Sequence, residues 1–466
     1  MTTSTQPKKL TVAIAGASGY IGRWFIHHFH QKYNIIGLSR KKVAHNPNPN
    51  VRWRQVELYS ISSTTEALKD VDVAIYLVHS MSASTRLNQG SFEDTDLLLA
   101  DNFSRAAALA NVKQIVYLGG LVPEGKEEDL SRHLMSRLEV EKTLGSRTAK
   151  LTALRASIIV GPGGSSFDMI KNLVKNLPVL MCPKWTESLT QPISLKNTLE
   201  IMDICVGNPN VYDQAIEIGS PEVMTYRDML ARTAEVMGKK RLVFSVPVFS
   251  LGLSKFWVGL FGQGPPQLVY PLVESLRHTL LVSKDKAFTE KEIEYLDYET
   301  AVKIALETTE EPLLPKFEKT EGMKNTVRSI QRMTNPSGYS ATWVANRYNI
   351  WLPTFFSFLI NGKTNENGEL GFHLLWGKKP MLQLTMIPDR SDSDRQLFYI
   401  TGGWLVKRFD YGWLEFRGVL DGKYILSAIH EFVPRLPWYI YVATQAKMHV
   451  WVMARFKNYL ERRQTD

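Results

Sequence analysis

Short apolar runs alternate with helical patterns through the first half of the chain. The runs predicted as strands cover residues 10–15, 33–38, 51–58, 73–78, 114–118 and 151–160. Helical spacing of apolar positions between them covers 20–30, 63–69, 96–110 and 131–144. Such alternation is typical of a parallel sheet with helices on both faces. We therefore predict an α/β, Rossmann-type doubly wound domain over residues 1–308, with a nucleotide part at about 8–160 and a substrate-side part at about 161–308.

The pattern changes after residues 309–321, whose prolines and mixed charges indicate a linker. Alternating apolar and polar positions then predict strands at 370–376, 381–387, 396–401, 412–419 and 424–432. One mostly apolar stripe at helical spacing follows through 438–462. We predict an α+β domain over 322–466, an antiparallel sheet around a long C-terminal helix. On one strand Glu415 and Arg417 share a face, where we expect them to pair with neighbours rather than to catalyse.

The first strand leads directly into Gly16, Gly19 and Gly22, and a helical pattern follows. The first glycine permits a sharp turn, the second lets the backbone approach a pyrophosphate, and the third lets the helix pack close to the strand. Backbone N–H groups at the start of the helix then face the phosphates. The motif predicts a dinucleotide site at this turn, with Ser18, Tyr20 and Ile21 completing it.

The end of the second strand carries Ser39, Arg40 and Lys41 where an NAD site usually has an acidic residue. Cations in this position suit the 2′-phosphate of NADP, because guanidinium grips phosphate at two points. The sequence thus favours NADP(H) over NAD(H). A solvated basic loop is the alternative interpretation.

Composition narrows the class of protein. The chain has 466 residues, a formal net charge of +10 and two cysteines, which excludes a disulfide scaffold and fits a reducing compartment. No zinc spacing or Walker loop occurs, so we predict no metal and no nucleic-acid partner. The apolar stretches at 242–261 and 437–456 are interrupted by proline or charge and are poor candidates for membrane spans. We expect a cytoplasmic protein, with peripheral contact to the inner face of the membrane through the first stretch left open.

Several segments across both halves carry a family resemblance. They include Tyr76-Leu-Val-His79, Tyr117-Leu-Gly-Gly-Leu121, Ser131-x-His133-Leu and Leu436-Pro-Trp438. The chain resembles atypical short-chain dehydrogenases/reductases, in the branch of NmrA-like proteins and a respiratory complex I accessory subunit. Over its whole length it is similar to bacterial oxidoreductase-like proteins that fuse this fold to a C-terminal SRPBCC (START-like) domain.

The resemblance implies where catalysis would lie. Active short-chain reductases use Tyr-x-x-x-Lys on the helix after the fifth strand and a Ser at the end of that strand. This chain has His133-x-x-x-Arg137 at the same spacing, and Gly119 and Gly120 at the strand end. We expect His133 to donate the proton, since its unperturbed pKa lies near neutrality, and Arg137 to hold ribose or phosphate. The alternative is that both are structural helix residues.

The remaining predicted contacts follow from family analogy and from strand ends. Further cofactor contacts are Leu58, Val78, His79, Ser80, Gly119 and Pro162, and the substrate contacts are Trp185, Gln191, Gln445 and His449. The last two would orient a ligand in an apolar cavity of the START-like domain that opens toward the nicotinamide. We expect an NADP(H)-dependent oxidoreductase acting on a lipophilic carbonyl, alcohol or quinone-like small molecule. An inactive dinucleotide sensor or assembly factor, and a lipid carrier with structural nucleotide, remain alternatives; the oligomeric state stays open.

Overall fold

The computed structural model describes residues 9–80, 87–123, 125, 127–246, 266–318, 326–357, 360–364, 369–375, 377, 379–409 and 412–463. The chain forms two compact units. The first unit contains Met1–Ser82 and Leu99–Thr320, and the second contains Ala83–Leu98 and Glu321–Asp466. Residues 83–98 therefore belong with the C-terminal part of the chain, although they lie within the first half of the sequence.

The first unit is built on a seven-stranded parallel sheet, which confirms the predicted fold class. Its strand order is β13-β8-β7-β5-β1-β2-β4, and all neighbours run parallel. The strands are β1 Thr11–Ala15, β2 Asn34–Ser39, β4 Val51–Gln55, β5 Val73–Tyr76, β7 Gln114–Gly120, β8 Lys150–Ala156 and β13 Gln214–Ile218. Every residue of β1 and β5 is buried, as expected for central strands covered on both faces.

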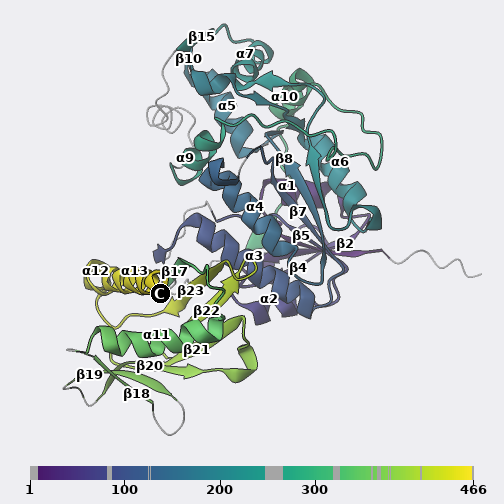
Figure 1. Cartoon of the computed structure of the whole chain (residues 1–466). Helices are drawn as coiled ribbons and strands as arrows, with labels where there is room; N and C mark the ends of the chain where they lie inside the picture. Colours follow the sequence, from purple (N-terminus) through teal and green to yellow (C-terminus); the bar gives the residue numbers. More distant parts are fainter. Residues whose placement is uncertain are drawn as a thin grey trace, which may run out of the picture. The chain divides into compact units, whose positions relative to one another are not determined.

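Helices cover both faces of this sheet (Figure 1). Around the sheet are α1 Tyr20–Phe29, α2 Ile61–Ala67, α3 Phe92–Leu109, α4 Arg132–Leu144 and α6 Leu195–Cys205. Successive residues of β1 enter opposite cores, since Val12 packs with Phe25 in one and Ala13 packs with Phe103 in the other. The period of two along a strand thus produces the two cores that the helices close.

The part of the first unit that we predict to lie on the substrate side contains helices and two-stranded sheets. Its helices are α5 Ser165–Asn176, α7 Tyr226–Val236, α9 Pro266–Ser275 and α10 Tyr298–Glu307. The small sheets pair β9 Ile159–Val160 with β12 Ile193–Ser194, β10 Val179–Pro183 with β15 Leu242–Val246, and β11 Leu189–Thr190 with β14 Met224–Thr225. A further pair, β3 Val43–His45 and β16 Lys316–Phe317, is antiparallel.

The second unit is an antiparallel sheet domain that ends in a long helix, as predicted. Its strand order is β18-β19-β20-β21-β22-β23-β17-β6. The strands are β18 Ile360–Thr364, β19 Leu370–Leu374, β20 Pro380–Met386, β21 Arg395–Gly402, β22 Trp413–Val419, β23 Tyr424–Phe432, β17 Val327–Thr334 and β6 Leu87–Gln89. Helices α11 Ala341–Phe355, α12 Trp438–Ala443 and α13 Gln445–Arg462 complete it. Only β6 joins its neighbour in the parallel sense.

The C-terminal helix differs from the single helix predicted over 438–462. It divides into α12 and α13 at Thr444, whose backbone leaves the helical region (φ −122°, ψ −83°). The Thr444 hydroxyl donates to the carbonyl oxygen of Ile440 at 2.6 Å. Such a bond to the residue four positions earlier competes with the helical ladder and bends helices. Two strands of this unit also escaped prediction, β6 because it is short and β18 because Asn361 and Gly362 interrupt its pattern.

Aromatic side chains fill the centre of the second unit. Tyr348 and Trp351 of α11 lie 5.0 and 5.1 Å, between ring centroids, from Phe456 of α13, and Phe416 of β22 packs against Tyr348 at 5.3 Å. These rings form a packed core, the arrangement most protein interiors adopt. The predicted apolar ligand cavity of this unit stays a prediction. Among the described residues, no helix is long and apolar enough to cross a membrane.

Candidate functional site

The turn after β1 has the geometry that its glycines predict. Gly16 has φ +91°, and a Cβ there would lie 2.9 Å from the carbonyl oxygen of Leu77. A Cβ on Gly22 would overlap the Gly16 carbonyl oxygen. Helix α1 begins at Tyr20 with Gly19 as its N-cap, which provides no side-chain hydrogen bond, and its first turn has no acidic residue. The N-cap and first turn of α1 therefore supply no acidic side chain of their own that would compete with a phosphate for these backbone amides.

The sheet order changes direction beside this turn. After β1 the chain builds β2 and β4 on one side, and then β5, β7, β8 and β13 on the other. Ligands of open α/β sheets bind outside the carboxyl ends of the strands at such a switch point. Gly16 follows β1, and Val78, His79 and Ser80 follow β5, so the structure places all four at this edge.

Two cations extend from the neighbouring strand end. Arg40 and Lys41 follow β2 and are exposed, and neither forms an ion pair within the described part of the chain. Ser39 Oγ accepts a hydrogen bond from the Lys41 amide at 3.1 Å, which fixes the turn. Lys42 differs, because its ammonium lies 3.2 Å from Glu318. Arg40 and Lys41 are thus available to an anionic group beside β1.

Pro162 and Leu58 have backbone roles around this edge. The carbonyl oxygen of Pro162 accepts a hydrogen bond from Trp24 Nε1 of α1 at 3.3 Å. The carbonyl oxygen of Leu58 accepts one from Asn102 Nδ2 at 2.9 Å. These bonds attach the loops after β9 and β4 to α1 and α3, so the two residues support the edge of the sheet near the predicted cofactor site.

Helix α4 presents His133 and Arg137 on one face, one turn apart. The helix starts at its N-cap Ser131, whose hydroxyl accepts from the Leu134 amide at 3.3 Å. His133 is half-buried, and its Nδ1 is shielded from solvent without a hydrogen-bond partner among the described residues. Arg137 is 8% exposed, and its carbonyl oxygen accepts from the Tyr117 hydroxyl at 3.2 Å. The spacing predicted from sequence therefore places both side chains at the same site.

An apolar cavity of about 290 Å³ lies beside this helix face. Its walls come from the carboxyl ends of β7 and β8 and from α4, α5, α7 and α9. His133, Arg137, Gly119 and Gly120 line it, together with Trp185. The volume lies near the lower end for small-molecule sites, and the mostly apolar lining with few polar groups is typical of them. The structure thus joins the predicted catalytic pair and one predicted substrate residue around a single cavity.

The electrostatics of His133 differ from the expectation. Burial lowers its pKa to about 3, and the neighbouring positive charges of Arg137 and His79 contribute to the same shift. The near-neutral pKa of an unperturbed histidine, from which the sequence argument started, therefore does not describe this buried side chain. The imidazole is neutral at physiological pH, so it can donate one ring N–H and accept at the other nitrogen. It holds no second proton to release.

Gln191 takes a structural position. Its side-chain Nε2 donates to the carbonyl oxygen of Ser220 at 3.0 Å, and its Oε1 accepts from the Val282 amide at 2.6 Å. It does not belong to the described cavity lining. Tyr226 does line the cavity, 6.5 Å from Trp185 between ring centroids, and burial raises the pKa of its hydroxyl to about 12. No motif marked Tyr226 in the sequence, because its place depends on tertiary packing.

Gln445 and His449 belong to the second unit, one turn apart on α13. Gln445 Oε1 and His449 Nε2 are shielded from solvent, and neither has a hydrogen-bond partner among the described residues. Burial lowers the pKa of His449 to about 4. Their role as ligand contacts stays a prediction.

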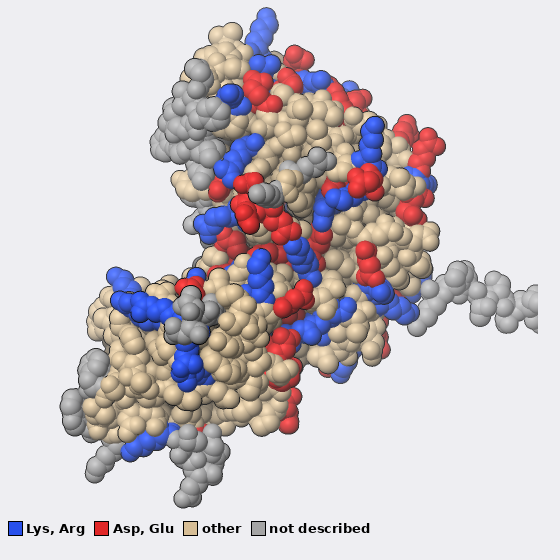
Figure 2. All heavy atoms as spheres, viewed as in Figure 1, with Lys and Arg blue, Asp and Glu red and all other residues tan. Residues whose placement is uncertain are grey.

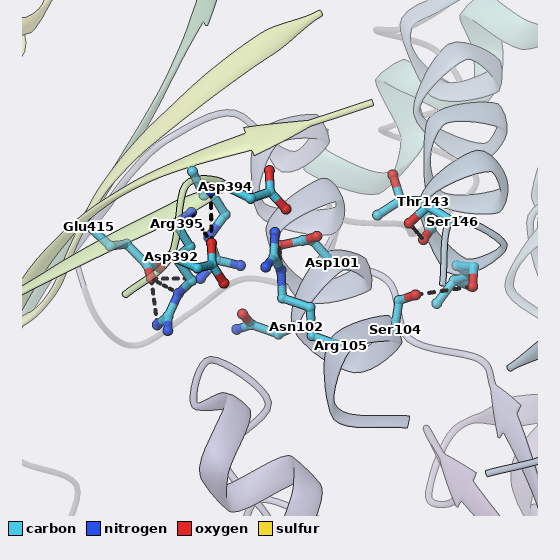
Figure 3. A network of polar contacts seen from close by, with 12 residues as sticks. Asp101, Asn102, Ser104, Arg105, Thr143, Ser146, Asp392, Asp394, Arg395 and Glu415 are labelled. Atoms are coloured by element: carbon cyan, nitrogen blue, oxygen red, sulfur yellow. Dashed lines mark hydrogen bonds and ion pairs between the residues drawn. The ribbon is translucent and has the colours of Figure 1, made fainter. Parts of the chain in front are cut away.

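A separate buried network in the second unit is structural. Glu415 accepts from Arg395 Nε at 2.9 Å, from Arg417 Nη2 at 2.6 Å and from His430 Nε2 at 2.9 Å. Figure 3 shows Arg395 between Glu415 and the turn at Asp392. The cations hold the pKa of Glu415 well below its usual range despite its burial. The prediction that Glu415 and Arg417 pair with neighbouring side chains is thus confirmed.

Comparison with known proteins shows what the first part of the chain is similar to. Residues 12–177 match the NAD dependent epimerase/dehydratase family. "Auxiliary protein GraX" of Staphylococcus aureus (strain NCTC 8325 / PS 47) is 26% identical over 184 residues, which cover 38% of this chain and 55% of that protein. The match therefore spans about half of that relative. The N-terminal part of the chain is therefore similar to NAD-dependent epimerase/dehydratase domains, and the match lies within residues 12–177.

Solved structures with a similar arrangement include two dinucleotide complexes. The triphenylmethane reductase of Citrobacter sp. complexed with NADP(H) is 17% identical and covers 63% of this chain and 100% of its own, with a TM-score of 0.49. The Bordetella bronchiseptica enzyme WbmH in complex with NAD+ is 14% identical and covers 64% of this chain and 97% of its own, with a TM-score of 0.47.

Proposed function

We propose that this protein is an NADP(H)-dependent oxidoreductase that transfers hydride to or from a small lipophilic carbonyl, alcohol or quinone-like substrate. The observation that carries the proposal is the apolar cavity at the carboxyl ends of β7 and β8. It lies along the same sheet edge as the glycine turn, two strand positions from β1. At about 4.8 Å between strands, this separation is roughly 10 Å, within the reach of an extended dinucleotide.

Along the carboxyl-end edge of the parallel sheet, successive strand ends suit successive parts of NADPH. The amides after Gly16 suit the pyrophosphate, and Arg40 and Lys41 beside β2 suit the phosphate on the adenosine ribose. The opposite direction along the edge leads past His79 to Gly119 and the cavity. This direction would bring the nicotinamide to the apolar lining and to His133.

The chemistry of this site rests on a neutral imidazole. Bound NADPH would supply the hydride, and the substrate oxygen would then need a proton. His133 would donate a ring N–H hydrogen bond to that oxygen and keep its own proton, so the proton that completes the alcohol would come from bulk water as the product leaves. Arg137 stays charged and can hold an anionic part of the cofactor. The apolar walls exclude water from the hydride path.

Steady-state assays of NADPH oxidation with aldehydes, ketones and quinones of graded chain length test the proposal. We expect His133→Ala to lower kcat by roughly a hundred- to thousandfold, the usual contribution of a hydrogen-bond donor to a developing oxyanion, while NADPH affinity is retained. Arg137→Ala should weaken NADPH binding. Arg132→Ala, an exposed position on the same helix, should leave both quantities unchanged. An equally active His133→Ala enzyme would remove His133 from the mechanism.

A dinucleotide sensor without turnover is the second candidate. Two observations favour it: the strand end carries Gly119 and Gly120 in place of a hydroxyl, and burial disfavours the charged form of His133. Tight, saturable NADPH binding without oxidation of the nucleotide across the whole substrate panel would establish the sensor over the enzyme.

A further inference from the structure

The paired strands β10 and β15 expose an apolar face. Their parallel register places Val179 beside Leu242, and Met181 beside Phe244. These four side chains point to one side, with exposed fractions of 37%, 69%, 54% and 46% for Val179, Leu242, Met181 and Phe244. We call them the β10–β15 face. The sequence analysis left open a membrane contact through residues 242–261. Most of that stretch falls within residues 247–265, which lie outside the described residues and are not part of this face.

The opposite side of the same strands is already packed. Leu180 and Val243 contact Val174 of α5 and Ala234 of α7 in a small apolar cluster. A strand with one face in water normally alternates apolar and polar residues, whereas apolar residues on both faces are typical of strands covered on both sides. The sequences Val179–Pro183 and Leu242–Val246 follow the second pattern. The β10–β15 face therefore has the composition of a surface that another body covers.

Cations outnumber carboxylates in the segments that flank these strands in the sequence. The flanking segments 175–187 and 235–246 carry five cations against two carboxylates, namely Lys175, Lys184, Lys239, Lys240 and Arg241 against Glu187 and Glu235. Glu187 lies 3.2 Å from Arg227, so its charge is balanced locally. At the end of the first unit where Figure 1 labels β10 and β15, Figure 2 shows tan surface with both Lys/Arg and Asp/Glu side chains beside it.

We propose that the β10–β15 face docks the protein on an anionic lipid surface. Apolar side chains that enter the headgroup region, with lysines around them, are the combination that peripheral membrane contacts use. A second copy of the chain fits less well, because a twofold contact through this face would bring two sets of lysines together. The proposal is independent of catalysis and does not require turnover.

The β10–β15 face is connected through short segments of chain to the walls of the apolar cavity. Trp185 and Thr186 line the cavity and follow the end of β10 by two and three residues. Helix α5, whose last turn carries Lys175, also lines it, through Ser166, Met169, Ile170 and Leu173. A protein docked through β10 and β15 would therefore hold its apolar cavity close to the bilayer. If the cavity binds substrate as proposed above, a lipophilic substrate could enter it from the membrane.

Sedimentation with vesicles of phosphatidylglycerol or phosphatidylcholine tests the docking. We expect saturable binding to phosphatidylglycerol, roughly tenfold or more above phosphatidylcholine and weakened by salt. The variants Leu242→Asp/Phe244→Asp and Lys239→Glu/Lys240→Glu should each lose about tenfold or more in binding. Because these side chains are exposed, thermal unfolding should show that both variants remain folded.

Matched controls keep the result specific. Leu313→Asp replaces an exposed leucine elsewhere, and Lys284→Glu/Lys291→Glu reverses two exposed lysines elsewhere; both should bind as the wild type does. Absence of vesicle binding, equal binding to both lipids, or unchanged binding of the face variants would overturn the proposal. Light scattering that shows concentration-dependent dimers, abolished by Leu242→Asp/Phe244→Asp, would assign the face to a second copy instead.

Discussion

Two strand ends of the same sheet contrast with each other: the turn after β1 and the end of β7 with its helix α4. At the first, the backbone makes the site, because Gly16 has a positive φ and Gly22 leaves no room for a Cβ. At the second, side chains make the site. There the spacing of His133 and Arg137 fits the family pattern, but the residue types differ from it.

The difference shows which kind of site is legible in a sequence. A backbone-made phosphate site tolerates few residues, so three glycines between a strand and a helix predict it well. A side-chain site depends on burial and on neighbours that are distant in sequence. The pKa of His133 illustrates this point, because desolvation and the charges of Arg137 and His79 together move it far from its ordinary value.

Replacement of Gly22 by valine should produce the largest effect. Its side chain would overlap the Gly16 carbonyl oxygen, so we expect NADPH affinity to fall by more than about a hundredfold, with lower thermal stability. Calorimetric titration and thermal unfolding measure the two effects. Gly120→Ala is the matched control at the end of β7, because its Cβ would lie 3.5 Å from Leu134, an ordinary contact. Unchanged NADPH binding by the Gly22 variant would contradict a phosphate site at this turn.

Acid should destabilise the protein through His133. Its pKa is about 3 in the folded protein, against an ordinary value of 6.5, so the unfolded chain binds a proton over this window that the folded protein does not. Stability is then lost as pH falls from 6.5 toward 3, by at most about 1.4 kcal/mol per pH unit from this group. Denaturant unfolding at several pH values should show a shallower loss for His133→Gln. Identical pH slopes would show that His133 is not buried as described.

Arg40→Ala should weaken NADPH by about 1–3 kcal/mol and leave NADH nearly unchanged, because only NADPH carries the 2′-phosphate. Arg52→Ala removes an exposed cation from the β4 strand next to β2 and serves as the control. Equal losses for both nucleotides would refute the assignment of Arg40 to the 2′-phosphate.

Gly120→Ser should have the smallest effect on stability, within roughly 1 kcal/mol, since a Cβ at this position would meet Leu134 and Arg137 at 3.5 and 3.8 Å. It adds a hydroxyl to the cavity, where the short-chain reductases that the sequence resembles have one. A rise in turnover would indicate that the protein is an enzyme whose activity is low because the end of β7 lacks this hydroxyl. A protein inactive before and after the change would favour the sensor.

The fold was largely predictable, and the site only in part. Alternating apolar runs predicted the parallel sheet because burial on both faces leaves a strong pattern, as in the fully buried β1. The break at Thr444 was not predictable, since threonine also occurs within helices. His133 could be found from its spacing on α4, but Tyr226 could not, because only packing brings it to the cavity. Gln191 looked like a substrate contact, although its amide bonds two backbone segments.

Calorimetric titration of the wild-type protein with NADPH and with NADH tests the central claim most directly. The account predicts saturable binding at one site per chain, with NADPH bound about tenfold or more tightly than NADH, the effect of one charge-assisted bond to the 2′-phosphate. Absence of saturable binding of either nucleotide would contradict the dinucleotide site at the turn after β1, and with it the proposed function.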